Sequence, residues 1–180
     1  MTELANLEAH GTLIEPATLE IRRVLPASVE RVWDYLTDSE LRRQWLASGD
    51  MTMKAGTSFE LVWRNDELAS RPSVPGNRPD GYGDEERMQS RILELDPPRR
   101  LVITWDTDGE VAFELAPRGN ETLLTIVHSR LASRAALLGV SAGWHMHLDV
   151  LLARMNARDP EPFWDGWRRL RVEYDERFAA

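Results

Sequence analysis

The chain has 180 residues, a formal net charge of −8 and no cysteine. This length suffices for one domain with its own hydrophobic core, and the absence of cysteine excludes disulfides, thiolate metal sites and a cysteine nucleophile. The acidic balance, the lack of a long apolar run and the lack of a secretory signal pattern predict a cytoplasmic protein with no nucleic-acid partner and no membrane span.

The first quarter of the chain predicts a tail, a strand and two helices. Residues 1–16 have no sustained hydrophobic period, which is typical of a flexible N-terminal tail. Residues 17–25 alternate loosely between apolar and polar, as a strand does. Ser28 is a good N-cap for a helix whose apolar residues follow at helical spacing, and a capping-box pattern at 37–40 predicts a second, short helix.

The middle of the chain predicts an antiparallel sheet. Apolar and polar residues alternate in five segments joined mostly by short turns, at 51–65, 85–96, 99–106, 110–116 and 121–130, and a short turn at 54–56 divides the first of them. Residues 66–84 interrupt this pattern with three prolines and three glycines and show no period. So long a loop is usually functional or disordered, and we expect either a lid over a binding site or simple disorder.

Two helices are predicted near the C-terminus. Within 139–156, Trp144, Leu148, Leu151 and Met155 fall within roughly 60° of one another around a helix. That stripe needs a concave apolar surface, and a curved sheet wrapped around the helix supplies one. The expected fold is therefore α+β, with a tail at 1–16, a domain at 17–157 and a helical extension at 158–180 that packs back on the domain.

Several short motifs, in this order, resemble the heat-shock-protein-90 ATPase activator-like family of the START and Bet v-like (SRPBCC) helix-grip superfamily. These motifs are LPASVERVW at 25–33 with LTD at 36–38, PPRRL at 97–101 with Trp105, TLL at 122–124 leading to His128, and Gly143 with Trp144. The resemblance spans about 18–156 and implies a helix-grip fold with a cavity between the sheet and the long helix. It implies no single activity, because the superfamily includes binders, polyketide cyclases, lipid carriers and chaperone cofactors.

We expect inward-facing side chains of the sheet and helices to line that cavity. The candidates are Trp33, Leu36, Phe59, Leu61, Trp63, Ile103, Trp105, Phe113, Ile126, His128, Trp144, His147, Leu148 and Leu151. The same residues would equally fill a solid core, because pockets and cores share an apolar composition. The two histidines among them could orient a polar ligand group or move protons, or could be core histidines with satisfied hydrogen bonds.

Neither a metal nor another cofactor is expected. His145 and His147 point about 200° apart on a helix, and His145 with Asp149 supplies only two ligands. We interpret His145 and Asp149 as a surface pair. A phosphate-binding glycine loop, a nucleophile elbow and a paired-carboxylate motif are all missing from the sequence.

Three hypotheses about function follow. The first is noncatalytic binding of a small apolar or aromatic molecule, such as a lipid, a polyketide or a flavonoid-like compound, with the 66–84 loop as a gate. The second is a cyclase- or hydrolase-type enzyme that uses the same cavity. The third is a chaperone-associated protein that acts through its surface. The sequence favours the first, in a monomer or a weak dimer, because the expected architecture needs nothing further.

Overall fold

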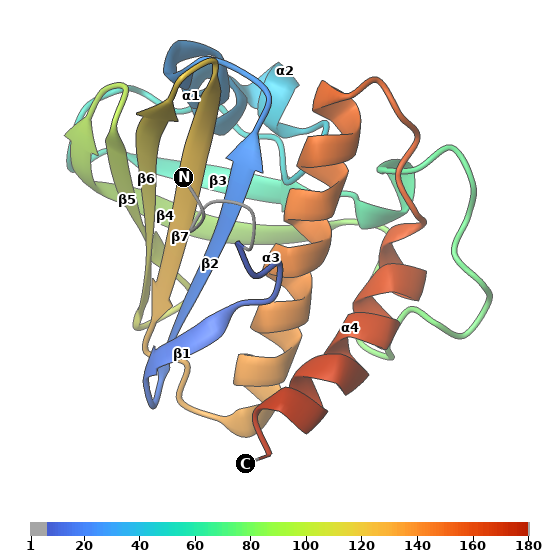
Figure 1. Ribbon diagram of the computed structural model, residues 1–180. Coiled ribbons are helices and arrows are strands. Elements are labelled where there is room, and N and C mark those ends of the chain that lie inside the picture. The colour runs from blue at the N-terminus through green and yellow to red at the C-terminus, as the bar shows by residue number, and fades with distance from the viewer. Residues whose placement is uncertain (1–6, 180) are drawn as a thin grey trace.

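A seven-stranded antiparallel sheet curves around a long helix in the computed structural model, which describes residues 7–179 (Figure 1). The strands are β1 (Thr12–Glu15), β2 (Thr18–Leu25), β3 (Ser58–Trp63), β4 (Glu86–Asp96), β5 (Arg100–Trp105), β6 (Gly109–Arg118) and β7 (Glu121–Ser129). Their order across the sheet is β1-β2-β7-β6-β5-β4-β3. The helices are α1 (Val29–Thr37), α2 (Ser39–Arg42), the short 3-10 helix η1 (Asn65–Glu67), α3 (Arg134–Met155) and α4 (Phe163–Arg177). The predicted α+β helix-grip architecture is confirmed.

Strand alternation determines which side chains form the core. In β7, Leu124, Ile126 and His128 are buried, whereas the residues between them are only half-buried. Ile126 lies opposite Ile21 of β2 and Phe113 of β6, so three neighbouring strands present apolar groups to the same face. A one-residue slip would turn all of these side chains to the other face, so burial of the inner face specifies the register.

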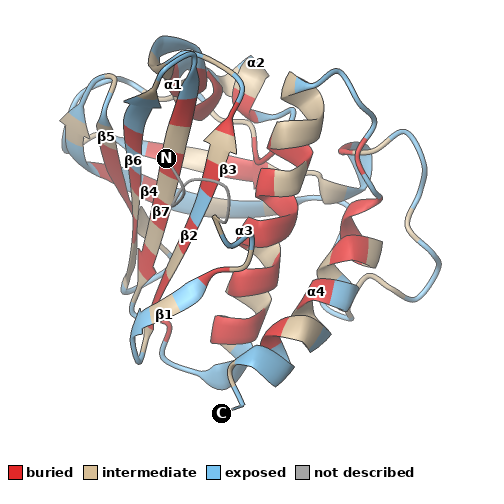
Figure 2. Cartoon of the chain, in the orientation of Figure 1, coloured by how far each residue is buried: buried red, intermediate tan, exposed pale blue. Residues whose placement is uncertain are grey.

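Helix α3 is buried on two sides, because the sheet covers one face and α4 covers another (Figures 1 and 2). It begins at Arg134, five residues before the expected start, where the Ser133 side chain accepts a hydrogen bond from the Ala136 amide. Of the residues described, only α3 is long and apolar enough to cross a membrane, and 61% of its most apolar window is buried inside the protein. Burial between two layers accounts for this composition.

Helix α4 packs along α3 as part of the same hydrophobic core. The Trp167 indole donates a hydrogen bond to the Gly139 carbonyl of α3 at 3.1 Å. A Cβ at Gly166 would collide with Met146, so the missing side chain lets the two helices approach. The helix starts at Phe163, inside the extension expected at 158–180, and the Asp159 carboxylate before it accepts hydrogen bonds from the backbone amide and the hydroxyl of Ser70.

The segment before β2 differs from the expected tail. Residues 12–15 form the edge strand β1, and the Gly11 amide donates a hydrogen bond of 2.7 Å to the Tyr174 hydroxyl of α4. A four-residue, mostly exposed strand leaves no periodic signal, because its backbone pairing does not depend on its side chains. The rest of the expected tail, 1–6, lies outside the described residues. In the segment expected at 51–65 as strand, turn and strand, the part before the turn forms no strand, and the part after it is β3.

His145 is buried, not on the surface as expected, because α4 covers the face of α3 that carries it. Its Nδ1 shares a hydrogen bond of 2.9 Å with the Tyr174 hydroxyl. Burial, and then the nearby Arg23 charge, lower the pKa of His145 to about 3, so the imidazole is neutral at pH 7. Asp149 lies 3.6 Å from Nε2 and also accepts a hydrogen bond from Arg23. This polar cluster ties the N-terminal segment to α3 and α4.

Candidate ligand-binding pocket

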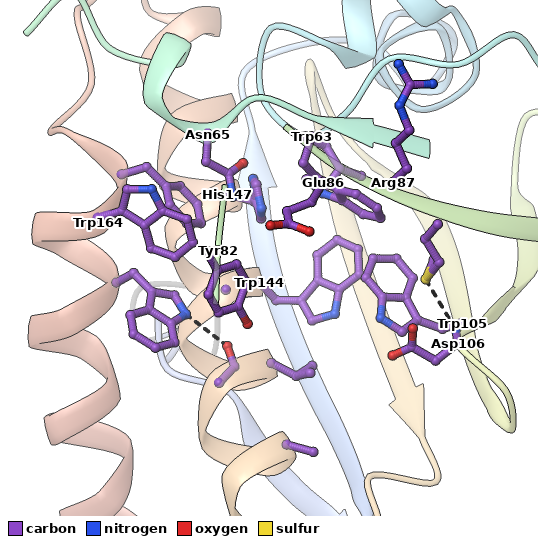
Figure 3. A pocket seen from close by; sticks show the side chains of 18 of the residues that line it. Trp63, Asn65, Tyr82, Glu86, Arg87, Trp105, Asp106, Trp144, His147 and Trp164 are labelled. Carbon is purple, nitrogen blue, oxygen red and sulfur yellow. Dashed lines mark hydrogen bonds between the residues drawn. The ribbon is translucent and has the colours of Figure 1, made fainter. Parts of the chain in front are cut away.

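A pocket of about 400 Å³ opens between α3, α4 and the strands β3 to β5 (Figure 3). Five of the seven tryptophans of the chain line it, namely Trp63, Trp105, Trp144, Trp164 and Trp167. They come from two strands and two helices that are far apart in the sequence, so only the folded chain brings them together. Tyr82, from the loop before β4, and Phe163 complete the aromatic wall.

The aromatic rings form a continuous series of contacts around the pocket. On the sheet side, the Trp105 ring centre lies 5.5 Å from that of Trp63 and 5.2 Å from that of Trp144. The ring centres of Trp144 and His147 are 6.5 Å apart, and those of His147 and Phe163 of α4 are 4.6 Å apart. These separations are those of tilted and edge-to-face aromatic pairs, which hold one another in fixed orientations.

The series continues on the α4 side and reaches the loop. Trp164 lies 4.9 Å from Phe163 and 5.6 Å from Trp167, and the Tyr82 ring lies 5.1 Å from Trp164. Figure 3 shows Tyr82 next to Trp164, on the α4 side of the pocket. A flat aromatic surface is therefore available on three sides of the space.

Small residues of α3 leave this space unfilled. Ala135, Gly139 and Gly143 are spaced by four, so they share one face of the helix, and all three line the pocket. A Cβ added at Gly143 would meet nothing within 4 Å. The pocket exists because this face of α3 carries almost no side-chain volume opposite large aromatic residues.

His147 presents a hydrogen-bond acceptor to the pocket. Its Nδ1 donates to the Trp45 carbonyl at 2.7 Å, which fixes the tautomer and leaves a lone pair on Nε2. Nε2 has no hydrogen-bond partner among residues 7–179. Burial lowers the pKa of His147 to about 4, although the Trp45 carbonyl acts in the opposite direction. The imidazole is therefore neutral at pH 7.

Two further polar atoms at the pocket lack partners. The Trp164 Nε1–H donor and the Asn65 Oδ1 acceptor are both buried, and neither has a hydrogen bond within the described part of the chain. The Trp164 side chain is only 3% exposed. Buried polar groups are nearly always satisfied, and leaving one unpaired costs about 1–3 kcal/mol. Both residues line the pocket, and His147 Nε2 is a third unpaired polar atom beside them.

The charged groups at the pocket are mainly acidic. The Glu86 carboxylate points into the space and accepts a hydrogen bond of 2.7 Å from the Gly83 amide (Figure 3). Asp106 lies at the rim, beside Trp105. Arg87 points away and pairs with Glu60 at 2.6 Å. Within residues 7–179, no group of three or more histidine or carboxylate side chains is arranged to hold a metal ion.

The structure divides the residues that were candidates from the sequence. Trp63, Trp105, Trp144 and His147 line the pocket. The other ten pack in the hydrophobic core or immediately behind the pocket wall, namely Trp33, Leu36, Phe59, Leu61, Ile103, Phe113, Ile126, His128, Leu148 and Leu151. Sequence reasoning missed the wall that α4 and Tyr82 contribute. The available signal was the clustering of aromatic residues at 163, 164 and 167, which is also typical of a helix that packs on a domain.

His128 supports the pocket without lining it. It is 1% exposed, and its Nδ1 accepts a hydrogen bond of 3.0 Å from the Trp144 indole. Burial lowers the pKa of His128 to about 4, so the ring is neutral and can accept this bond at pH 7. Its role in the structure is to hold Trp144 against the sheet.

Comparison with known proteins gives a family and a set of similar folds. The family described as Activator of Hsp90 ATPase homolog 1-like protein matches residues 26–156. The solution structure of a protein from Bordetella parapertussis is 34% identical, with a TM-score of 0.78 over 95% of this chain and 91% of that one. The crystal structure of CalU16 from Micromonospora echinospora is 26% identical, with a TM-score of 0.62 over 90% of this chain and 85% of that one.

A more distant structure shows the same fold. DynU16, a protein in the dynemicin biosynthetic locus, is 18% identical, with a TM-score of 0.63 over 81% of this chain and 49% of that one. Among curated proteins, none matches the sequence of this chain.

Proposed function

Because the chain belongs to the Activator of Hsp90 ATPase homolog 1-like family, whose pattern covers most of its length, we propose a function located in the pocket that this fold encloses. The protein binds a small, flat aromatic or amphipathic molecule between α3, α4 and the sheet, and binding requires no chemical step. The observation that carries this proposal is a pocket of about 400 Å³ whose aromatic wall includes five tryptophans and Tyr82.

The pocket walls suit a planar ligand. Ligand pockets are typically 300–1,000 Å³, lined by apolar and aromatic groups with a few placed polar atoms. Here the volume is about 400 Å³, and the walls are indole, phenol and phenyl rings. A fused two- or three-ring molecule can stack on these faces and still reach the polar atoms.

The unpaired atoms select the substituents of that ligand. Trp164 Nε1–H requires an acceptor such as a carbonyl or ether oxygen, and His147 Nε2 and Asn65 Oδ1 require donors such as hydroxyl groups. The nearby Glu86 carboxylate also prefers a donor and disfavours an anion at the same end. A neutral, hydroxylated aromatic compound with a carbonyl group meets all of these requirements.

The 66–84 loop supports a gating role. Asp165 of α4 accepts hydrogen bonds of 2.8 Å from both the Val74 amide and the Asn77 side chain. Asp159 holds Ser70 in a similar way, so carboxylates next to or within α4 anchor the loop beside this helix. Tyr82 at its end reaches the aromatic wall. We propose that the loop opens to admit the ligand.

The test is an NMR titration that follows the seven indole N–H signals. Emodin, naringenin and oleic acid serve as probes of a fused aromatic, a flavonoid and a lipid. We expect saturable shifts for the five pocket tryptophans, largest for Trp164. The indoles of Trp33 and Trp45 are internal controls, because they lie outside the pocket and Trp45 Nε1 already donates to the Tyr35 carbonyl. Equal shifts of all seven signals, or none with any probe at millimolar concentration, would refute the proposal.

A cyclase- or hydrolase-type enzyme is the second candidate, favoured by the neutral His147 and the Glu86 carboxylate in one pocket. Such a pair can accept and return a proton during ring closure or hydrolysis. The discriminating variant is Glu86→Gln, which keeps the shape of the side chain. An enzyme would bind the probes and lose turnover of them, whereas a binding protein would show no turnover in either form.

A further inference from the structure

A second, smaller cleft of about 170 Å³ shares one wall with the aromatic pocket. Leu46 lines both, so the two spaces are neighbours. The walls of this cleft include three arginines, Arg43, Arg64 and Arg154, and one carboxylate, Glu67. It is therefore a positively charged site on a chain whose net charge is −8.

The arginines come from three separate parts of the chain. Arg43 directly follows α2, Arg64 directly follows β3, and Arg154 lies in the last turn of α3. Three positively charged side chains that line one small cleft favour the binding of an anion there. Arg64 pairs with Glu85 at 2.5 Å, and Arg43 pairs weakly with Glu40 at 3.4 Å. These pairs leave most of the N–H donors unused.

Arg154 is held in place before any ligand arrives. Its Nε donates to the Gln44 carbonyl at 3.2 Å and its Nη2 to the Leu68 carbonyl at 2.5 Å. Neither acceptor carries a full charge, and Nη1 has no hydrogen-bond partner in the described part of the chain. A fixed guanidinium with a spare donor loses little side-chain entropy when it binds an anion.

From this geometry we infer that the cleft is an anion-binding site for a compact oxyanion, either a phosphate or a carboxylate group. Arg154 provides the fixed donor, Arg43 and Arg64 close on the anion from the rim, and the Ser48 hydroxyl offers a further polar contact. Guanidinium groups match the planar, two-oxygen geometry of such anions. The site takes either a free anion or the charged end of a small molecule, and it does not depend on what fills the aromatic pocket.

The test is a titration with inorganic phosphate at constant ionic strength, followed by the Nε–Hε NMR signals of the arginines. We expect saturable shifts confined to Arg43, Arg64 and Arg154. Arg43→Gln should weaken phosphate binding about threefold or more, since it removes one partly exposed charge. Arg99→Gln is the matched control, because Arg99 also makes an exposed i,i+3 pair of 3.4 Å with a carboxylate, here Asp96, away from the cleft.

A second arm separates the two sources of the anion. 1-Naphthyl phosphate should bind no tighter than inorganic phosphate if the site takes free anions. It should bind more tightly, and also shift the indole signals of the aromatic pocket, if the anion is carried on a larger ligand. The inference is overturned if phosphate shifts all arginine signals alike without saturation, or if Arg99→Gln weakens binding as much as Arg43→Gln does.

Discussion

Replacing Gly143 by leucine should separate the pocket from the stability of the fold. Gly143 lies inside α3 and faces the pocket, where an added Cβ meets nothing within 4 Å. A leucine there would place four carbon atoms into the space that we assign to the ligand. Most substitutions that abolish binding also damage the fold, but this one should not.

The expected magnitudes follow from the position. Glycine in a helix interior costs about 1 kcal/mol relative to alanine, and leucine is nearly as favourable as alanine, so Gly143→Leu should raise the free energy of unfolding by about 0.5–1 kcal/mol. Ligand affinity should fall at least tenfold, about 1.4 kcal/mol, because the side chain and the ligand compete for the same volume. Gly143→Ala is the matched control. It should give most of the gain in the free energy of unfolding that Gly143→Leu gives, with little loss of ligand affinity.

Urea unfolding followed by tryptophan fluorescence measures the first effect, and the indole NMR titration measures the second. Unchanged affinity in Gly143→Leu would place the ligand elsewhere. Destabilisation of both variants would show that this face of α3 is tightly packed and that the pocket is not open.

Arg42 is 1% exposed and donates to four backbone carbonyls around the end of α1 and the loop after α2. Arg42→Met should therefore lower the free energy of unfolding by about 2–5 kcal/mol, whereas the control Arg43→Met should change it by no more than about 0.5 kcal/mol. Tyr174→Phe should cost about 1–3 kcal/mol and speed hydrogen exchange at the Gly11 amide, which loses its acceptor; an equal effect of Tyr82→Phe would contradict this. Burial lowers the pKa values of His128, His145 and His147 to between about 3 and 4, so the unfolded chain binds more protons than the folded chain below pH 6.5. The contribution of these histidines to the free energy of unfolding should be complete above that pH and should be lost on acidification towards pH 4. A flat series of urea midpoints between pH 7 and 5 would refute this.

The fold class could be predicted because it depends on local patterns. Alternation along the strands, the Ser28 cap and the apolar stripe on α3 each follow from the spacing of neighbouring residues, and all agree with one architecture. Where local pattern is weak, prediction failed. The short strand β1 pairs with β2 at the edge of the sheet, and the Asp159 carboxylate ahead of α4 binds Ser70, which lies far away in the chain.

The site itself depends on the tertiary structure. Four of the expected residues line the pocket, but whether an aromatic side chain packs in a core or borders a space depends on the volume of whatever lies opposite. Here Gly139 and Gly143 of α3 line the same space as tryptophan rings from distant segments, and no local pattern encodes that mismatch.

The sequence by itself determined the α+β class, the order of most strands and helices, and the presence of an inward aromatic surface, because these follow from the spacing of residues along the chain. Only the tertiary structure decided that α4 covers α3 and buries His145, that the Trp45 carbonyl sets the tautomer of His147, and that three arginines line one cleft next to Leu46. The physical reason is that hydrogen-bond partners, burial and empty volume arise between segments far apart in the chain, and their energies exist only once those segments are in contact.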